Sequence, residues 1–170
     1  MAYSGWLFAI SKIYSRMKKI LFVCLGNICR SPLAEGVFLH LAQQAGRGDE
    51  FEVDSCGTGS WHVGEHPDPR SQAVARKHGV KLNHRARQFD RSDFKNFDLI
   101  IVMDRDNKSD LLSFLNLKPE ERAKIKLLRE YDPEANGDLN VPDPYYGGAD
   151  GFEQVYQMVE RAGKRLLESL

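Results

Sequence analysis

The chain has 170 residues, the length of one ordinary domain, and 42% of them are hydrophobic and 28% charged. This composition is typical of a globular protein and excludes a disordered one. Lys and Arg together number 24, as do Asp and Glu, so the formal net charge is zero. The balance excludes a global basic field of the kind that recruits nucleic acid or acidic membranes, and any affinity for anions must be local.

Residues 1–16 differ from the rest of the chain. Their apolar stretch, residues 5–10, is much shorter than a membrane span and is not followed by the small-residue cleavage site of a signal peptide. We expect residues 1–16 to be a poorly ordered N-terminal extension, with a docked helix as the alternative, and residues 17–170 to form a single domain. With neither secretion signal nor membrane span, a cytoplasmic location is expected, with Cys24, Cys29 and Cys56 reduced.

The cysteines and histidines lack the spacing of a metal site. Cys24 and Cys29 have no second close pair downstream, whereas structural zinc usually takes four ligands. His62 and His66 have Gly64 between them, which disfavours a shared helical face and favours a solvated loop. The sequence therefore predicts no metal and no other cofactor.

Apolar patterning alternates between strands and helices along the chain. The predicted elements, in chain order, are strand 20–23, helix 32–46, strand 51–53, helix 69–78, strand 99–103, helix 104–117, strand 125–128 and a final helix from 152. Such alternation predicts a doubly wound α/β fold, a flavodoxin-like sandwich with four parallel strands and helices on both faces. Ligands bind such folds beyond the carboxyl ends of the strands. The long loop 131–151 is the second place where function is expected.

The loop after the first strand reads CLGNICRSP over residues 24–32. It has neither the lysine of a nucleotide-triphosphate loop nor the three glycines of a dinucleotide fingerprint. A tight turn that opens a helix can point its backbone N–H groups inward and form an anion nest. The residues expected to form it are Leu25, Gly26, Asn27, Ile28 and Cys29. Arg30 can clamp two oxygens of a phosphoryl group, because its planar fork matches that geometry.

The same loop makes Cys24 a candidate nucleophile. A thiol at a helix N-terminus beside an arginine is largely a thiolate at neutral pH, and Ser31 can donate a hydrogen bond to its sulfur. The alternative is that Cys24 is a small buried hydrophobic residue and Arg30 a surface charge. The preceding apolar strand, the following helix and the internal Gly-Asn favour the functional interpretation.

An alcohol leaving group needs a proton, for which Asp143 is the candidate general acid. It lies in VPDPYY, residues 141–146, where prolines on both sides stiffen the loop. An isolated Asp-Pro pair is more often only a turn, so the loop by itself does not establish this role.

Taken together, residues 23–32 and 143–147 closely resemble the low-molecular-weight protein tyrosine phosphatases. The resemblance runs from about residue 18 to the end and includes VDS at 53–55, SWHVG at 60–64, DPR at 68–70, HRAR at 84–87, and FD at 97–98 leading into MD at 103–104. It implies hydrolysis of phosphotyrosine and other aryl phosphate monoesters through a phosphocysteine intermediate. The implied partners are tyrosine-phosphorylated proteins or small aryl phosphates, with inhibition by phosphate, vanadate and similar oxyanions.

Carried over to matching positions, the resemblance implies a role for each residue of the set. Cys24 is the implied nucleophile, Arg30 the phosphate clamp, and Asp143 the general acid that then activates water. The implied supporting residues are Asn27, Ser31, Ser55 and His84 for the loop, Trp61 and Tyr145 for the walls of the aromatic pocket, and Cys29 as reversible disulfide partner of the nucleophile.

Three other interpretations remain open. A thioredoxin-coupled arsenate reductase resembles the same fold and loop, but it uses further cysteines later in the chain, and none follows Cys56. A protein-arginine phosphatase of the same family typically has threonine where this chain has Ile28, so Ile28 favours aryl phosphates. A phosphate-sensing or redox-responsive protein without turnover is the third, and Asp143 argues against it.

Overall fold

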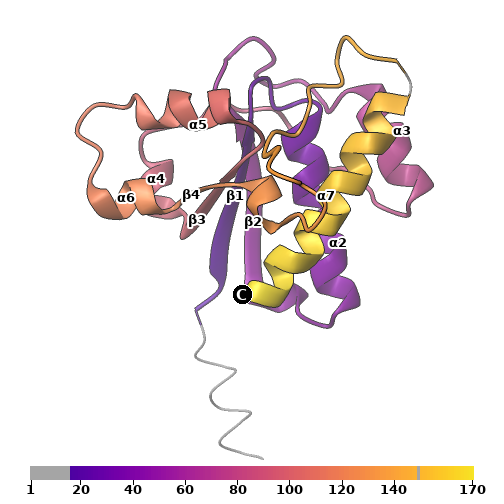
Figure 1. The fold of residues 1–170 in the computed structure, drawn as a ribbon, viewed down its shortest axis with the longest axis horizontal. Helices are drawn as coiled ribbons and strands as arrows, with labels where there is room; N and C mark the ends of the chain where they lie inside the picture. The colour runs from indigo at the N-terminus through magenta and orange to yellow at the C-terminus, as the bar shows by residue number, and fades with distance from the viewer. Residues whose placement is uncertain (1–15, 149) are drawn as a thin grey trace, which may run out of the picture.

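A computed structural model describes residues 16–148 and 150–170, and Figure 1 shows their arrangement. The predicted extension therefore lies outside the described residues except for Arg16, which pairs with Asp98 at 3.1 Å. The elements, in chain order, are β1 Lys18–Cys24, α2 Arg30–Gln44, η1 Gly48–Glu50, β2 Phe51–Gly57, α3 Pro69–Lys77, α4 Asp93–Asn96, β3 Leu99–Val102, α5 Arg105–Leu112, α6 Pro119–Ala123, β4 Ile125–Leu127, η2 Leu128–Tyr131 and α7 Asp150–Ser169.

The sheet confirms the predicted doubly wound topology. Its four strands are parallel and lie in the order β2-β1-β3-β4, with Ile20 of β1 paired to Val53 on one side and to Leu99 on the other. The chain leaves β1 toward β2 at one edge and leaves β3 toward β4 at the other. Connections therefore diverge at the carboxyl ends of β1 and β3, which is where a ligand cleft opens in such folds.

Alternate residues of the strands supply two separate cores. Ile20 and Phe22 of β1 belong to the cluster that packs with α2 and α7, whereas Leu21 and Val23 belong to the cluster on the opposite face with Phe94. Figure 1 shows α2, α3 and α7 on one side of the sheet and α4, α5 and α6 on the other. A strand covered on both faces must be apolar throughout, which explains the unbroken hydrophobic runs in the sequence.

The predicted helix 104–117 is too long, because α5 ends at Leu112. Asn116 has a positive φ of 58°, and Pro119 opens α6, so the chain turns where the apolar pattern continues. Leu115 is 84% exposed, whereas Leu117 is buried without belonging to a helix. The short helices α4 and α6 were not predicted, because four or five residues carry too little periodicity.

Helix α2 begins at Arg30, two residues before the predicted start. Proline is tolerated in the first turn of a helix, because the N–H that it lacks would have no hydrogen-bond partner there. Pro32 therefore lies inside the first turn of α2 and does not mark where the helix begins.

Among the described residues, no helix combines the length and the apolar character needed to cross a membrane.

Candidate active site

The loop between β1 and α2 turns its backbone carbonyl groups outward. Four of them, at residues 24, 25, 28 and 29, accept hydrogen bonds from neighbouring segments at 2.7–2.9 Å. The donors, in order along the loop, are the N–H groups of Thr58, Gly59 and Asp68 and the hydroxyl of Ser71. With these carbonyls bound elsewhere, the interior of the loop is left to N–H groups. The arrangement fits the predicted anion nest.

Two backbone features allow this loop to close so tightly. Asn27 has a positive φ of 57°, which Asn tolerates better than most residues. Gly57, at the end of β2, lies against the loop, where an added Cβ would come within 2.6 Å of the carbonyl oxygen of Leu25. A side chain at position 57 would therefore push the loop out of shape.

The amide of Asn27 holds the loop from beneath. Its Oδ1 accepts from the backbone N–H of Arg87 at 3.0 Å and from Nε2 of His84 at 2.8 Å. Its Nδ2 donates to the hydroxyls of Ser31 at 2.9 Å and Ser55 at 3.0 Å. Because the N–H of Arg87 can only donate, the orientation of the amide is fixed. His84 must then carry its proton on Nε2.

The sulfur of Cys24 lies at the floor of the loop and is oriented by two donors. Ser31 Oγ is 3.0 Å from the sulfur, and the N–H of Asn27 donates to it at 3.2 Å. The Ser31 hydroxyl already accepts from the Asn27 side chain, so its one proton can go either to the sulfur at 3.0 Å or to the carbonyl oxygen of Cys56 at 3.3 Å. Cys24 is only 2% exposed, so this sulfur is reached only through the loop opening.

Arg30 is 3% exposed and its guanidinium is tightly held. Nη1 donates to Asp104 Oδ2 at 2.6 Å and to the carbonyl of Val141 at 3.0 Å, and Nη2 lies 3.5 Å from Asp143 Oδ2. Burial acts to lower the pKa of Arg30, but the sulfur of Cys24 and the carboxylate of Asp104 outweigh it, and the pKa is raised. The guanidinium therefore stays charged and fixed in direction.

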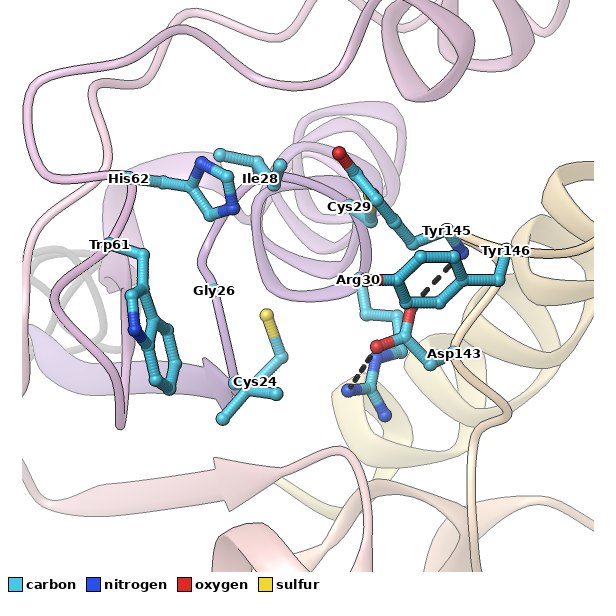
Figure 2. A pocket seen from close by; sticks show the side chains of 11 residues that line it. Cys24, Gly26, Ile28, Cys29, Arg30, Trp61, His62, Asp143, Tyr145 and Tyr146 are labelled. Atoms are coloured by element: carbon cyan, nitrogen blue, oxygen red, sulfur yellow. Dashed lines mark hydrogen bonds and ion pairs between the residues drawn. The ribbon is translucent and has the colours of Figure 1, made fainter.

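Asp143 lies across the opening from Cys24, as Figure 2 shows. Its side chain is 45% exposed, and its Oδ1 accepts from the N–H of Tyr145 at 3.1 Å. One carboxylate oxygen thus serves to hold the turn, while the other faces Arg30 and the cavity. The structure brings Asp143 to the same cavity as Cys24 and Arg30, although the three come from distant segments.

Aromatic side chains form the walls of this cavity, which has a volume of about 440 Å³. Trp61 and His62 stand on one side, and Tyr145 and Tyr146 on the other (Figure 2). Trp61 is 70% exposed, and the two tyrosine rings meet edge to face with centroids 4.8 Å apart. Of the predicted residues, Asn27, Ser31, Ser55 and His84 lie beneath the loop, and the others line the cavity.

Glu35 completes the network and was not predicted. It accepts from the Ser55 hydroxyl at 2.6 Å and lies 3.2 Å from Nδ1 of His84. Burial, with Asp54 adding to it, raises the pKa of Glu35 to about 7, and burial lowers the pKa of His84. Ligand atoms of Glu35, Asp54 and His84 lie within 4.8 Å of one another, a spacing that would suit a metal ion, but hydrogen bonds already engage all three side chains.

Cys29 and Cys56 are buried thiols. Burial, reinforced by Asp68 and Cys24, raises the pKa of Cys29 to about 12. Burial also raises the pKa of Cys56 well above its usual value. Neither group is therefore a thiolate at neutral pH.

Asp104, His62 and Tyr146 were also missed as site residues. Asp104 is the first residue of the predicted helix 104–117, and its side chain caps α5 by accepting from the N–H of Asn107 at 2.7 Å. Its position two residues after β3, at the edge where ligands bind, was the available signal. Tyr146 is 94% exposed and His62 lies in a loop, so neither carried a pattern of its own.

A parallel α/β sandwich with a buried cysteine and arginine at the two ends of an anion-binding loop defines a class of phosphate-binding proteins. Within that class, the family model described as "Low molecular weight phosphotyrosine protein phosphatase" matches residues 19–170. The chain therefore belongs to this family, whose members are phosphoric monoester hydrolases.

Individual relatives agree with the family assignment. A low molecular weight protein-tyrosine-phosphatase of Streptomyces coelicolor is 52% identical over 155 residues, covering 89% of this chain and 93% of the relative. The crystal structure of a protein tyrosine phosphatase from Entamoeba histolytica matches with a TM-score of 0.84 at 39% identity, covering 89% and 96% of the two chains. The crystal structure of a Drosophila arginine phosphatase matches with a TM-score of 0.81 at 38% identity, covering 89% and 96%.

Proposed function

We propose that this chain hydrolyses phosphotyrosine and other aryl phosphate monoesters, with Cys24 as nucleophile, Arg30 as phosphate clamp and Asp143 as general acid and base. The observation that carries the proposal is the single cavity that these three side chains share, with the cysteine sulfur at its floor. Family membership supplies the reaction class, and the geometry supports the roles.

Binding comes first. The phosphate oxygens accept from the inward N–H groups of the loop and from the guanidinium of Arg30, which Asp104 holds in place. The phosphorus atom then lies over the Cys24 sulfur. Because the charged guanidinium of Arg30 is already fixed in direction, it does not have to move when negative charge redistributes in the transition state.

In the first chemical step, the Cys24 thiolate attacks phosphorus and the bond from phosphorus to the aryl oxygen breaks. Asp143, protonated, gives its proton to the departing oxygen, so phenol leaves rather than phenolate. The product on the protein is a phosphocysteine. The 45% exposure of the Asp143 side chain, at the mouth of the cavity, fits contact with a leaving group that points outward.

In the second step, Asp143 is a carboxylate and takes a proton from water, whose oxygen attacks phosphorus. The bond between sulfur and phosphorus breaks, and its electron pair returns to Cys24. Donors at 3.0 Å and 3.2 Å, from Ser31 and the N–H of Asn27, stabilise the thiolate that leaves. Phosphate is released, and phosphate and vanadate compete with substrate for the same N–H groups.

Substrate choice follows from the walls. Trp61 and Tyr145 offer apolar faces for a flat ring, and Ile28 narrows the loop beneath them. A phosphotyrosine side chain is long enough to carry its phosphorus to the cysteine, whereas phosphoserine is too short. Tyrosine-phosphorylated proteins or small aryl phosphates are the proposed substrates.

Protein-arginine phosphatase activity is the second candidate, because a solved Drosophila arginine phosphatase is among the structural neighbours. Ile28 lines the cavity in this chain, and its branched side chain offers no hydrogen-bond partner to a guanidinium N–H. Comparing kcat/KM for matched phosphotyrosine, phosphoarginine and phosphoserine peptides decides between the candidates. A preference for phosphoarginine would overturn the substrate assignment and leave the nucleophile untouched.

The nucleophile is tested with Cys24→Ser. We expect turnover to be abolished while phosphate and vanadate still raise the melting temperature, since the nest and Arg30 remain. Cys56→Ser, at a buried cysteine outside the cavity, is the matched control for loss of a thiol. Substantial activity in Cys24→Ser would exclude covalent catalysis by Cys24.

A further inference from the structure

The start of α3 is fastened to the phosphate-binding loop. The N–H of Asp68 donates to the carbonyl of Ile28 at 2.7 Å, and the hydroxyl of Ser71 donates to the carbonyl of Cys29 at 2.8 Å. Two consecutive carbonyls of the loop are thus bound to the first turn of one helix. A side chain fixed to this turn therefore keeps a fixed position relative to phosphate bound in the loop.

Arg70 projects from this turn and is gripped by Asp68. Nε of Arg70 donates to Asp68 Oδ1 at 3.0 Å and Nη2 donates to Oδ2 at 2.8 Å, while Asp68 itself is only 8% exposed. Hydrogen bonds from Arg70 lower the pKa of Asp68, so the pair stays ionised. A bidentate pair of this kind fixes the direction of the guanidinium.

The remaining arm of Arg70 reaches the loop that carries Asp143. Nη1 donates to the carbonyl of Tyr145 at 3.0 Å. The guanidinium also lies over the ring of Tyr145, 5.3 Å from its centroid, and over Phe152 of α7 at 4.7 Å. One side chain therefore links three segments: the first turn of α3, which is hydrogen-bonded to the phosphate-binding loop, the loop that carries Asp143, and the first turn of α7.

Asp143 lies between two such attachments. On one side, Val141 donates to the carbonyl of Met103 at 2.8 Å and accepts from Arg30 at 3.0 Å. On the other, Tyr145 donates its N–H to Asp143 Oδ1 at 3.1 Å, the dashed contact beside Tyr145 in Figure 2. In the part of the chain that the structure describes, the hydrogen bond that ties Tyr145 to α3, and so to the phosphate-binding loop, comes from Arg70.

We propose that Arg70 is a positioning residue for the general acid: it holds Tyr145, and through Tyr145 the carboxyl of Asp143, at a fixed place above the phosphate. This proposal rests on the proposed function, since it assumes that Asp143 protonates the leaving group. Proton transfer needs hydrogen-bond distance, and a misplacement of about 1 Å can cost about 10²-fold in rate. Loss of Arg70 must therefore hurt most where the leaving group most needs a proton.

The test is a series of substituted phenyl phosphates whose leaving groups differ in basicity. For Arg70→Ala we expect kcat to fall by about tenfold or more on phenyl phosphate and far less on strongly activated esters, which steepens the Brønsted slope. Arg70→Lys should recover little, because an ammonium cannot hold Asp68 and Tyr145 at once. Arg76→Ala, at an exposed arginine in the last turn of the same helix, should leave the slope unchanged.

Two further variants make the outcome decisive. Asp68→Asn keeps a capping side chain at the start of α3 but loosens the grip on Arg70, so it should steepen the slope less than Arg70→Ala does. On an Asp143→Asn background, Arg70→Ala should change the slope no further, because the group that it positions is gone. Thermal melting of each variant verifies that it is folded.

Three results would overturn the proposal, and they differ in what else they touch. If Asp143→Asn steepens the slope and Arg70→Ala does not, positioning by Arg70 is wrong and the proposed function stands. If KM rises equally for all esters with kcat unchanged, Arg70 only supports the Tyr145 wall. If neither variant alters the slope, the acid role of Asp143 falls together with this proposal.

Discussion

Asp104 should control both the stability of the free protein and the strength with which phosphate binds. Its carboxylate is the partner of Arg30 at 2.6 Å, and the two side chains are 19% and 4% exposed. Removing one member of a buried pair leaves the other charge uncompensated, at a cost of about 3–5 kcal/mol. Asp143 lies farther from the guanidinium, at 3.5 Å, and compensates only in part.

Two substitutions separate the charge from the helix cap. Asp104→Asn keeps an oxygen that can accept from Asn107, so its cost is mainly the lost charge and should be about 3 kcal/mol. For a protein of this size, that lowers the melting temperature by about 6–12 °C. Asp104→Ala also removes the cap and should cost about 1 kcal/mol more.

Bound phosphate should offset the stability that Asp104→Asn loses. The phosphate dianion gives Arg30 the charged partner that the substitution removed, and in the variant the dianion is not repelled by the carboxylate of Asp104. The melting temperature of Asp104→Asn should therefore rise more with saturating phosphate than that of the parent, while kcat falls because the guanidinium has lost its orientation. Asp106→Asn, exposed in the first turn of the same helix, is the control. Equal or weaker phosphate protection in Asp104→Asn would refute this reasoning.

Three more predictions concern buried groups. Burial raises the pKa of Glu35 from its ordinary value of 4.5 to about 7 in the folded chain, so its contribution to stability is fully present below pH 4.5 and is lost as pH rises through 7. Between pH 5 and pH 8, the free energy of unfolding of Glu35→Gln, measured in urea, should therefore rise relative to that of the parent by an amount on the order of 2 kcal/mol. A difference that stays constant with pH would contradict this. Peroxide should convert Cys24 to a sulfenic acid; the Cys29 sulfur then attacks the sulfenic sulfur, whose hydroxyl leaves as water, and a disulfide forms. Because burial raises the pKa of Cys29, mass spectrometry should show this step accelerating by about tenfold per pH unit above neutrality. Gly57→Ala should lose phosphate binding and activity, because its Cβ would lie 2.6 Å from the Leu25 carbonyl oxygen. Activity equal to that of the parent would show that the loop tolerates a side chain at position 57.

The sequence was most informative where one element follows directly from its neighbours. The unbroken apolar run of β1 predicts a central parallel strand, and Cys24 is its last residue, so the position of the proposed nucleophile followed from chain order. Arg30 was predicted to face the same loop, although the helix was expected to begin at residue 32 and Arg30 is in fact the first residue of α2. The helices predicted to start at residues 69 and 104 follow from local sequence too, since Asp68 and Asp104 accept the hydrogen bonds that cap their first turns.

The parts that escaped prediction depend on contacts between distant segments. Asp104 and Arg30 are 74 positions apart, and no local pattern in either segment indicates that Asp104, which caps α5, also binds the arginine at the start of α2. Glu35 lies on the face of α2 that meets the loop containing His84, so its role depends on the fold having formed. The over-long helix at 104–117 has a similar cause, because Phe114 and Leu117 pack against the core from a turn while Leu115 between them is exposed.

A protein without net charge can still bind a dianion because its charge is arranged locally. Around Arg30, the structure gathers one sulfur and two carboxylates, so the single cation of the loop is overcompensated before any ligand arrives. A bound phosphate ester would face the same guanidinium as these carboxylates. The contact with Asp143, at 3.5 Å, is the longer one and the easier to replace, whereas Asp104, at 2.6 Å, keeps the guanidinium in place while the ester is bound.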